Sequence, residues 1–149
     1  MFTERMERIL ESENELSAIL NGILEECSCA VGTIHRFDPE TNALHMVAHH
    51  GLPAPLLERV NTIPMGKGMA GLAAERKEPV QVCNLQTDES GAAKPSAREA
   101  RMEGSLTVPI LEGDTLRGTL GIAKPVEHEF TTEEVAMVME AGRRIAGKL

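Results

Sequence analysis

One short glycine-rich segment constrains the fold of this chain more than any other feature. Residues 63–85 read IPMGKGMAGLAAERKEPVQVCNL, with Gly66 and Gly68 on either side of Lys67 and Gly71 directly before strong helix formers at 72–77. Pro79 ends this helix, because the residue before a proline avoids the helical region, and residues 80–85 then have the pattern of a short strand. Glycine lets the backbone turn tightly and approach whatever lies opposite. The segment therefore predicts the wall of a pocket.

This segment resembles the part of GAF domains that reads glycine-x-glycine-apolar-x-glycine, a short helix, and then proline-valine-x-valine. Residues 36–52, RFDPETNALHMVAHHGL, resemble a GAF strand–turn–strand, and residues 105–124, SLTVPILEGDTLRGTLGIAK, resemble the closing hairpin. The three segments come in the family's order, and the resemblance covers residues 15–149. The general likeness is closest to the GAF segments of bacterial enhancer-binding activators and sensor kinases. GAF domains bind many ligands or none, so the resemblance implies the fold more strongly than the function.

The resemblance implies an α+β fold, GAF-like, with a central antiparallel sheet of about five to six strands. The N- and C-terminal helices are expected on one face of the sheet, with short helices and loops forming a pocket on the other. We expect a single domain over residues 1–149, because this length supplies one core. Within it, residues 1–28 are expected to form a long helix, residues 30–124 the sheet and pocket elements, and residues 131–148 the last helix.

Composition excludes several classes of partner. The net charge of −8 disfavours binding to nucleic acid. No apolar run approaches the length of a membrane span and no basic-then-apolar leader is seen, so we expect no membrane partner. Three cysteines, an odd number without a regular framework, favour a reducing cytoplasm. With three Phe and no Trp or Tyr, the core must be aliphatic, with eight Met as adaptable filler.

The N-terminal helix carries an apolar seam with heptad spacing. In the first half of the helix the apolar stripe is narrow and the other positions carry many charges. In the second half the stripe widens, and there the helix should lie on the sheet. A narrow seam that projects beyond its own domain needs a partner, so we expect a homodimer through the N- and C-terminal helices. The apolar seam positions are Phe2, Met6, Ile9, Leu16, Leu20, Ile23 and Cys27, with Glu13 as the one polar position.

The remaining elements follow from turn and capping signals. A first hairpin, strands 30–37 and 44–50, is expected around Asp38-Pro39, with Asn42 in a left-handed conformation. The second hairpin, 105–111 and 115–124, turns at 112–114. Further expectations are a short helix after Pro53 and Pro55, a lid over residues 86–96, a brief helix from Ser96 to Glu103 with Glu99 completing a capping box, and a last helix with Thr131 and Glu134 as its capping box.

The pocket is expected between the sheet and residues 53–104. Methionines suit a pocket that repacks around a ligand, and two arginines on a lid suit a small anion or carboxylate. The alternative is that the methionines are core filler and the arginines are solvated. The candidate ligand-binding residues are Met65, Lys67, Met69, Leu85, Arg98, Arg101, Met102 and Ser105, with Leu72, Val82, Asn84 and Leu106 as further lining candidates.

One enzymatic branch of the family has to be weighed, the free methionine-(R)-sulfoxide reductases. That resemblance implies one cysteine in the glycine-rich turn, another shortly before the strand at 105, and a glutamate after its serine. This chain has no cysteine at either place and Leu106 at the glutamate position. We therefore expect no catalytic residues, and Cys27, Cys29 and Cys83 are interpreted as buried small hydrophobic residues. A redox enzyme that uses Cys83 remains a second alternative.

No metal or cofactor is predicted. His35, His45 and His49 would converge only if the hairpin register placed His35 opposite His45, and no cysteine or carboxylate has ligand spacing. Some GAF domains that bind cyclic nucleotides have an asparagine-lysine, phenylalanine, aspartate-glutamate signature. Here the asparagine is missing, so Lys124 with Glu133 or Glu134 is interpreted as a structural latch. A bilin chromophore lacks both its cysteine environment and its aromatic pocket.

The sequence thus predicts a non-catalytic sensory or regulatory domain. It would bind a small molecule and pass the change through its terminal helices to a signalling protein. The alternative from another class is a structural dimerisation module with a collapsed pocket and no ligand.

Overall fold

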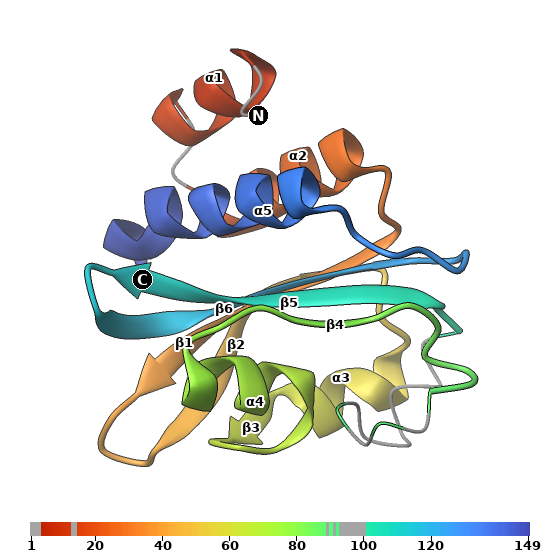
Figure 1. The fold of residues 1–149 in the computed structure, drawn as a ribbon. Coiled ribbons are helices and arrows are strands. Elements are labelled where there is room, and N and C mark those ends of the chain that lie inside the picture. The colour runs from red at the N-terminus through yellow and green to blue at the C-terminus, as the bar shows by residue number, and fades with distance from the viewer. Residues whose placement is uncertain (1–3, 13–14, 89, 91, 93–100) are drawn as a thin grey trace.

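A six-stranded antiparallel sheet separates two layers of helices. The elements are α1 Glu4–Ser12, α2 Leu16–Cys27, β1 Val31–Asp38, β2 Ala43–His50, α3 Ala54–Val60, β3 Thr62–Pro64, α4 Gly68–Arg76, β4 Val80–Val82, β5 Gly104–Glu112, β6 Thr115–Lys124 and α5 Thr132–Ile145. The computed structural model describes residues 4–12, 15–88, 90, 92 and 101–149. The strand order is β3-β2-β1-β6-β5-β4. Helices α1, α2 and α5 lie on one face and α3 and α4 on the other (Figure 1), which confirms the predicted α+β architecture.

The first hairpin turns where the sequence predicts it. The Asp38 carboxylate accepts hydrogen bonds from the Glu40 backbone N–H at 3.0 Å and from the Thr41 hydroxyl at 3.1 Å. Asn42 has a φ of +54°, the left-handed conformation that asparagine tolerates. Between Ile34 and His35 the pairing of β1 with β2 slips by a residue. This slip decides which β2 side chains share a face with His35.

The last helix is held at its start by the predicted capping box. The Thr131 hydroxyl accepts a hydrogen bond from the Glu134 backbone N–H at 3.1 Å, and the Glu134 carboxylate accepts one from the Thr131 backbone N–H at 2.9 Å. Two of the N–H groups that a helix start leaves unpaired are thereby satisfied. Phe130, directly before the cap, is buried. These two features together fix where α5 begins.

The expected single N-terminal helix is wrong, because two helices, α1 and α2, form instead. Glu15 is extended, with φ −82° and ψ 123°, so the helical backbone is interrupted there. Met6 and Leu10 of α1 are buried in the core that α2 and α5 share. The Arg144 guanidinium on α5 donates two hydrogen bonds to the Glu7 carboxylate, at 2.8 and 3.0 Å. The described part of the narrow seam, with Met6 and Ile9, therefore packs within its own domain.

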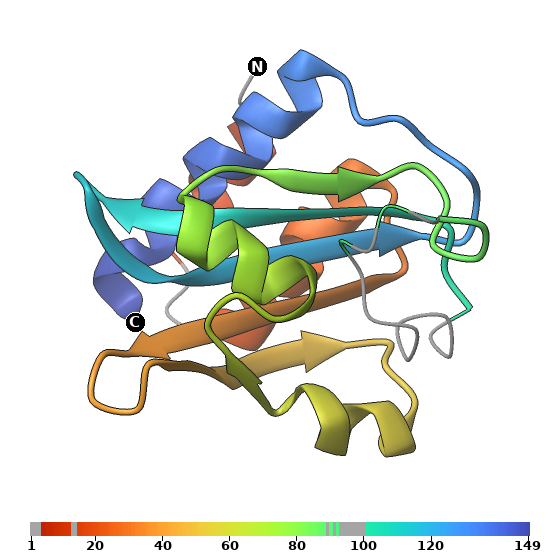
Figure 2. The same cartoon turned by 60° about the horizontal axis from the view of Figure 1, so that its bottom comes forward.

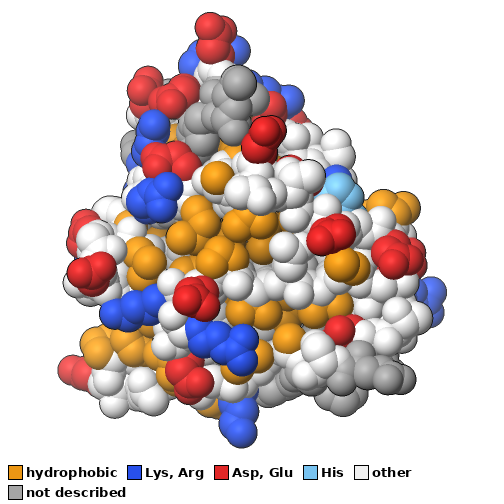
Figure 3. All heavy atoms as spheres, in the orientation of Figure 1, with side chains coloured by type: hydrophobic (Ala, Val, Ile, Leu, Met, Phe, Trp, Pro, Cys, Tyr) orange, Lys and Arg blue, Asp and Glu red, His pale blue; other side chains and the backbone are white. Residues whose placement is uncertain are grey.

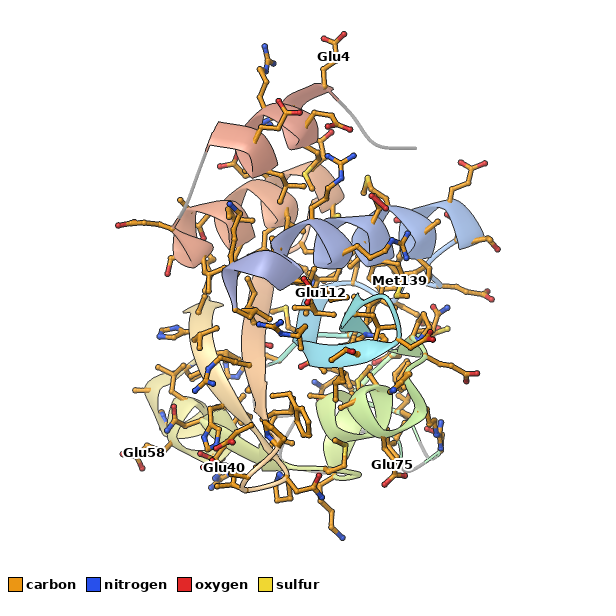
Figure 4. The ribbon with its side chains drawn as sticks, turned by 90° about the vertical axis from the view of Figure 1, so that its left-hand side faces the viewer. Glu4, Glu40, Glu58, Glu75, Glu112 and Met139 are labelled. Atoms are coloured by element: carbon orange, nitrogen blue, oxygen red, sulfur yellow. The ribbon has the colours of Figure 1, made fainter. Side chains whose placement is uncertain are left out.

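The main core fills the space between the sheet and the helices α1, α2 and α5. It is aliphatic as predicted, with Phe130 as its aromatic member among the described residues. Glu4 lies on the outer turn of α1, away from the sheet, and marks the solvent side of this layer (Figure 4). In the described parts of the chain, every helix is too short or too polar to cross a membrane.

On the opposite face the glycine-rich segment is more helical than expected. Helix α4 begins at Gly68, whereas the sequence indicated a turn up to Gly71. A Cβ on Gly71 would lie 2.7 Å from the Pro64 carbonyl oxygen, so this glycine is required for the close approach of α4 to β3. Gly66 has a φ of +82° and makes the tight turn that precedes the helix.

The brief helix expected over 96–103 falls largely outside the described residues, with Ser96 and Glu99. Its described end is not helical. Arg101 has a φ of +57°, a left-handed conformation that ends or excludes an α-helix at that residue.

Candidate functional site

A cavity of about 450 Å³ lies between the sheet and the layer of α3 and α4. This volume is in the range of small-molecule sites. Figure 2 turns this face forward, with α4 crossing the sheet and α3 beside β3. The lining residues are Val31, Gly32, Thr33, His35, Leu52, Leu56, Arg59, Val60, Ile63, Lys67, Gly68, Met69, Ala70, Leu85, Met102, Ser105, Thr107, Gly121, Ile122 and Ala123.

The floor of the cavity is a polar strip on the sheet. Thr33 on β1 and Thr107 on β5 are both paired with Gly121 on β6, which lies between them. A Cβ on Gly121 would lie 3.1 Å from the Thr33 hydroxyl oxygen and 3.3 Å from that of Thr107. Ser105 adds a third hydroxyl, which donates to the Ile122 carbonyl oxygen at 3.4 Å. The floor thus presents three hydroxyl groups near Gly121, where the backbone carries no side chain.

His35 completes the floor and is 1 % exposed. Its Nε2 lies 2.7 Å from the Val60 carbonyl oxygen at the end of α3. A carbonyl oxygen only accepts, so Nε2 carries the proton and the neutral ring keeps a lone pair on Nδ1. Nδ1 is buried without a hydrogen-bond partner among the described residues. Burial lowers the pKa of His35 against the raising effect of the Val60 hydrogen bond.

The rim carries positive charge. Among the described residues that line the cavity, the charged ones are Arg59 on α3 and Lys67 at the start of α4, and both are exposed. The acidic side chain of Glu58 on α3 points outward, away from the body of the molecule (Figure 4). The Glu75 carboxylate on α4 lies against Gly66, where a Cβ would be 2.6 Å from its Oε2, and is not part of the described lining. The walls between rim and floor are apolar and come from Leu52, Leu56, Ile63, Met69, Leu85 and Met102.

The structure brings together five of the eight candidate ligand-binding residues. Lys67, Met69, Leu85, Met102 and Ser105 line the cavity.

The other three candidates are placed differently. Met65 and the exposed Arg101 are not among the lining residues, and Arg98 lies outside the described residues. Leu106 belongs to the core on the opposite face of the sheet, because it alternates with the two lining residues Ser105 and Thr107. Leu72, Val82 and Asn84 are also absent from the described lining.

Sequence reasoning missed the polar floor and Arg59. Thr33 and His35 alternate with the buried Ile34 on β1, and Thr107 is two residues beyond the proposed Ser105. Because side chains two apart on a strand share a face, this alternation was a usable signal. Arg59 had no comparable signal, since its place at the rim depends on how α3 packs on the sheet.

The histidines do not converge. The slip after Ile34 pairs His35 with Met46, and His45 is paired with Arg36 instead. His45 contacts the hydroxyls of Thr41 and Thr62, at 3.2 and 3.4 Å. His49 is exposed. In the described residues no group of three or more His, Cys, Asp or Glu side chains is arranged to hold a metal ion.

At the expected latch, His128 rather than Lys124 contacts the acid. The His128 Nε2 lies 3.0 Å from the Glu134 carboxylate. Burial alone would raise the pKa of Glu134, but the hydrogen bonds from the Thr131 backbone and from His128 outweigh it and hold this pKa below its usual value. Lys124 Nζ lies 6.0 Å from the centre of the Phe130 ring. Glu133 is exposed on the first turn of α5.

None of the three cysteines is among the described residues that line the cavity. Burial raises the pKa of Cys27 to about 11 and that of Cys29 to about 12. A nucleophilic thiol needs the opposite shift, because the thiolate is the reactive form. The expectation that Cys83 is buried is wrong, because this residue follows β4 and is exposed.

Comparison with known proteins places these features in a family. A family model described as "GAF domain" matches residues 11–147. No protein of curated function matches the sequence significantly.

Among solved structures, the GAF domain of an Acinetobacter phosphoenolpyruvate-protein phosphotransferase has a TM-score of 0.79 at 18% identity, over 97% of this chain and 87% of that one. A free methionine-R-sulfoxide reductase from Neisseria meningitidis, solved with its substrate, has a TM-score of 0.78 at 16% identity, over 96% and 83%. A putative GAF sensor protein from Burkholderia vietnamiensis has 0.75 at 22% identity, over 96% and 87%. At these identities the likeness concerns the fold, which sensor domains and reductases share.

Proposed function

The chain belongs to the GAF domain family, and on this premise we propose that it is a non-catalytic sensory or regulatory domain that binds a small molecule in the cavity beneath α3 and α4. The observation that carries the proposal is the cavity itself. It has an apolar wall, a polar floor and a cationic rim, and such a combination of many apolar contacts with a few convergent polar groups is typical of ligand sites. A collapsed pocket, as a purely structural module would have, does not fit a volume of about 450 Å³.

The ligand would be sensed through the edge strand β4. Leu85, in the cavity wall, donates its backbone N–H to the Glu103 carbonyl oxygen at 2.7 Å. Cys83, two residues before it, accepts a hydrogen bond from the His128 backbone N–H at 3.1 Å. Gln81 accepts one from the Phe130 backbone N–H at 3.0 Å. A ligand that displaces Leu85 would therefore move the segment that leads directly into α5.

The output surface would be the layer of α2 and α5, which we propose pairs with a second copy of the chain in the cytoplasm. Val135, Met137 and Met139 on α5 are only partly buried against the core. Hydrophobic side chains gather in the middle of the face shown in Figure 3, with charged side chains around them. Such a patch on a small domain favours association. The output partner would then be a signalling protein that reads the arrangement of the paired helices.

Sedimentation velocity tests this pairing. Wild type is expected to be dimeric at micromolar concentration and Met139→Glu monomeric. Val47→Glu, which changes an exposed apolar residue on β2, is the matched control and should leave the dimer intact. A wild-type protein that sediments as a monomer at all concentrations would overturn this part of the proposal.

A thermal-shift screen against small metabolites tests ligand binding. A compound that binds only the folded state raises the melting temperature with concentration. Gly121→Ala places a methyl group between the Thr33 and Thr107 hydroxyls and should reduce the shift produced by a hit. Gly147→Ala is the control, because a Cβ there meets nothing within 4 Å. A hit that Gly121→Ala leaves unaffected would bind elsewhere and contradict the site.

The enzymatic alternative has its own test. The fold is shared with free methionine-R-sulfoxide reductases, so wild type is assayed for thiol-dependent reduction of free methionine sulfoxide. No turnover is expected. Turnover by wild type that Cys83→Ala abolishes would replace the sensory proposal by the reductase.

A further inference from the structure

The start of helix α4 opens into the cavity. Lys67, Gly68, Met69 and Ala70 all line it. Lys67 occupies the N-cap position, makes no side-chain cap, and is followed by a first turn without an acidic residue. The first N–H groups of a helix lack intrahelical acceptors and carry partial positive charge, so an uncapped helix start attracts anions. An anionic ligand in the cavity would accept hydrogen bonds from these N–H groups.

The charges at the rim have the same sign as this helix end. Arg59 and Lys67 are cations, and the described lining contains no acid. This is not a consequence of overall composition, because the chain has a net charge of −8. Two cations in the lining of one cavity of an acidic protein favour a negatively charged ligand, and the Glu75 carboxylate beside Gly66 is outside that lining. Both cations are exposed, which places the charged end of the ligand at the mouth.

Whereas the rim favours an anion, the floor of the cavity favours a hydrogen-bond donor. His35 Nδ1 is an acceptor, because Nε2 donates to Val60. It is buried, lacks a partner among the described residues, and belongs to a ring that lines the cavity. A buried acceptor without a donor is costly, and most such groups in folded proteins are satisfied. Its cross-strand neighbour Thr119 also has an unpartnered hydroxyl but is not among the lining residues.

We propose that the ligand is a small organic carboxylate with an apolar body and a hydrogen-bond donor at its far end. The carboxylate lies at the start of α4 beside Lys67 and Arg59. The apolar body contacts Met69, Leu85 and Met102, and the donor reaches His35 Nδ1. This inference rests on the proposed function and specifies the chemical class that the same cavity selects.

Four probes separate the two polar ends. 4-Hydroxyphenylacetate has both the carboxylate and the donor. 4-Methoxyphenylacetate lacks the donor, 4-hydroxyphenylacetamide lacks the charge, and 4-methoxyphenylacetamide lacks both. Titration calorimetry of the wild-type chain is expected to give the tightest binding for the first. Each removal should weaken binding by about tenfold, as expected for one lost charge-assisted or buried hydrogen bond.

Variants of the protein test which residue binds each end of the ligand. Lys67→Met should abolish the preference for the carboxylate over the amide. Lys77→Met, at the other end of α4 and outside the lining, is the matched control and should keep it. Thr119→Val tests the alternative that Nδ1 is satisfied by a water shared with Thr119. This variant should leave the preference for hydroxy over methoxy probes intact.

A measurement on the wild-type chain avoids variants of His35 that fold poorly. With ¹⁵N-labelled histidine, the Nδ1 resonance of His35 should move on addition of 4-hydroxyphenylacetate and stay in place with 4-methoxyphenylacetate. Carboxylates that bind no better than the amides, or an Nδ1 signal indifferent to the phenol, overturn the inference. Tight binding of neutral compounds that Gly121→Ala weakens would overturn only this ligand class. A cavity that binds nothing in the metabolite screen either would overturn the proposed function as well.

Discussion

The Nε2 of His35 donates a hydrogen bond of 2.7 Å to the carbonyl oxygen of Val60. One residue is on the central strand β1 and the other is the last residue of α3. The bond therefore joins the floor of the cavity to one of the two helices that cover it. The bond places a proton on Nε2, and burial favours the neutral ring, which leaves Nδ1 as the acceptor.

This arrangement makes stability depend on pH near neutrality. Burial lowers the pKa of His35 from its ordinary value of 6.5. As the pH falls below that value, the unfolded chain takes up a proton that the folded protein does not, so stability falls down to the lower pKa of the folded state. Urea unfolding between pH 7.5 and 5 should show this loss. The loss should be smaller in His35→Leu, and an equal loss in the variant would assign it to other groups.

Truncation of Met6 tests whether α1 packs on its own domain. Met6 is fully buried, so Met6→Ala should lower the free energy of unfolding by about 2–3 kcal/mol. The effect should not change with protein concentration, because the contacts are within one chain. Glu11→Ala, at an exposed position of the same helix, should change stability by less than about 0.5 kcal/mol. A concentration-dependent effect of Met6→Ala would indicate a seam between chains.

The capping box of α5 should contribute measurably. Thr131→Ala removes the hydroxyl that accepts from the Glu134 backbone N–H, and an N-cap of this kind is worth about 1 kcal/mol. Chemical denaturation measures the loss. Thr132→Ala, one residue later and exposed, removes the same hydroxyl from a position that makes no cap. Equal effects of the two substitutions would show that the cap does not stabilise α5.

The three thiols should differ in reactivity. Cys83 is exposed, whereas burial raises the pKa values of Cys27 and Cys29. Ellman's reagent at pH 8 should label one thiol rapidly in the folded protein and the other two only on unfolding. Cys83→Ser should remove the fast phase. Rapid labelling of Cys27 or Cys29 would mean that the layer of α2 and α5 opens far more readily than its packing indicates.

The features that the sequence predicts well are those set by local chemistry. The Asp38-Pro39 turn, Asn42 and the Thr131–Glu134 capping box depend on a few neighbouring residues, and all three form as expected. The break at Glu15 was not predictable in this way. The apolar stripe continues on both sides of it, and the folding of α1 back onto the core, where Met6 is buried, is a tertiary contact.

In the cavity, too, the sequence predicts what neighbouring residues determine and misses what tertiary packing determines. Lys67 and Met69 were found because they lie in the glycine-rich segment, whose backbone chemistry is distinctive. His35 was singled out as a metal candidate, and its pairing with Met46 instead of His45 depends on the slip in strand pairing after Ile34. Arg59 enters the rim only through the packing of α3. Both facts concern the relation between elements, which one-dimensional patterns do not contain.

The most direct test of ligand binding in the cavity uses the methionine methyl groups. Met69 and Met102 line the cavity, whereas Met137 and Met139 lie on α5. A protein labelled with ¹³C-methyl methionine is titrated with each stabilising metabolite. The account predicts nuclear Overhauser contacts from the ligand to the methyl groups of Met69 and Met102. Contacts only to Met137 or Met139, or ligands that leave the two cavity methyl groups unperturbed, would contradict it.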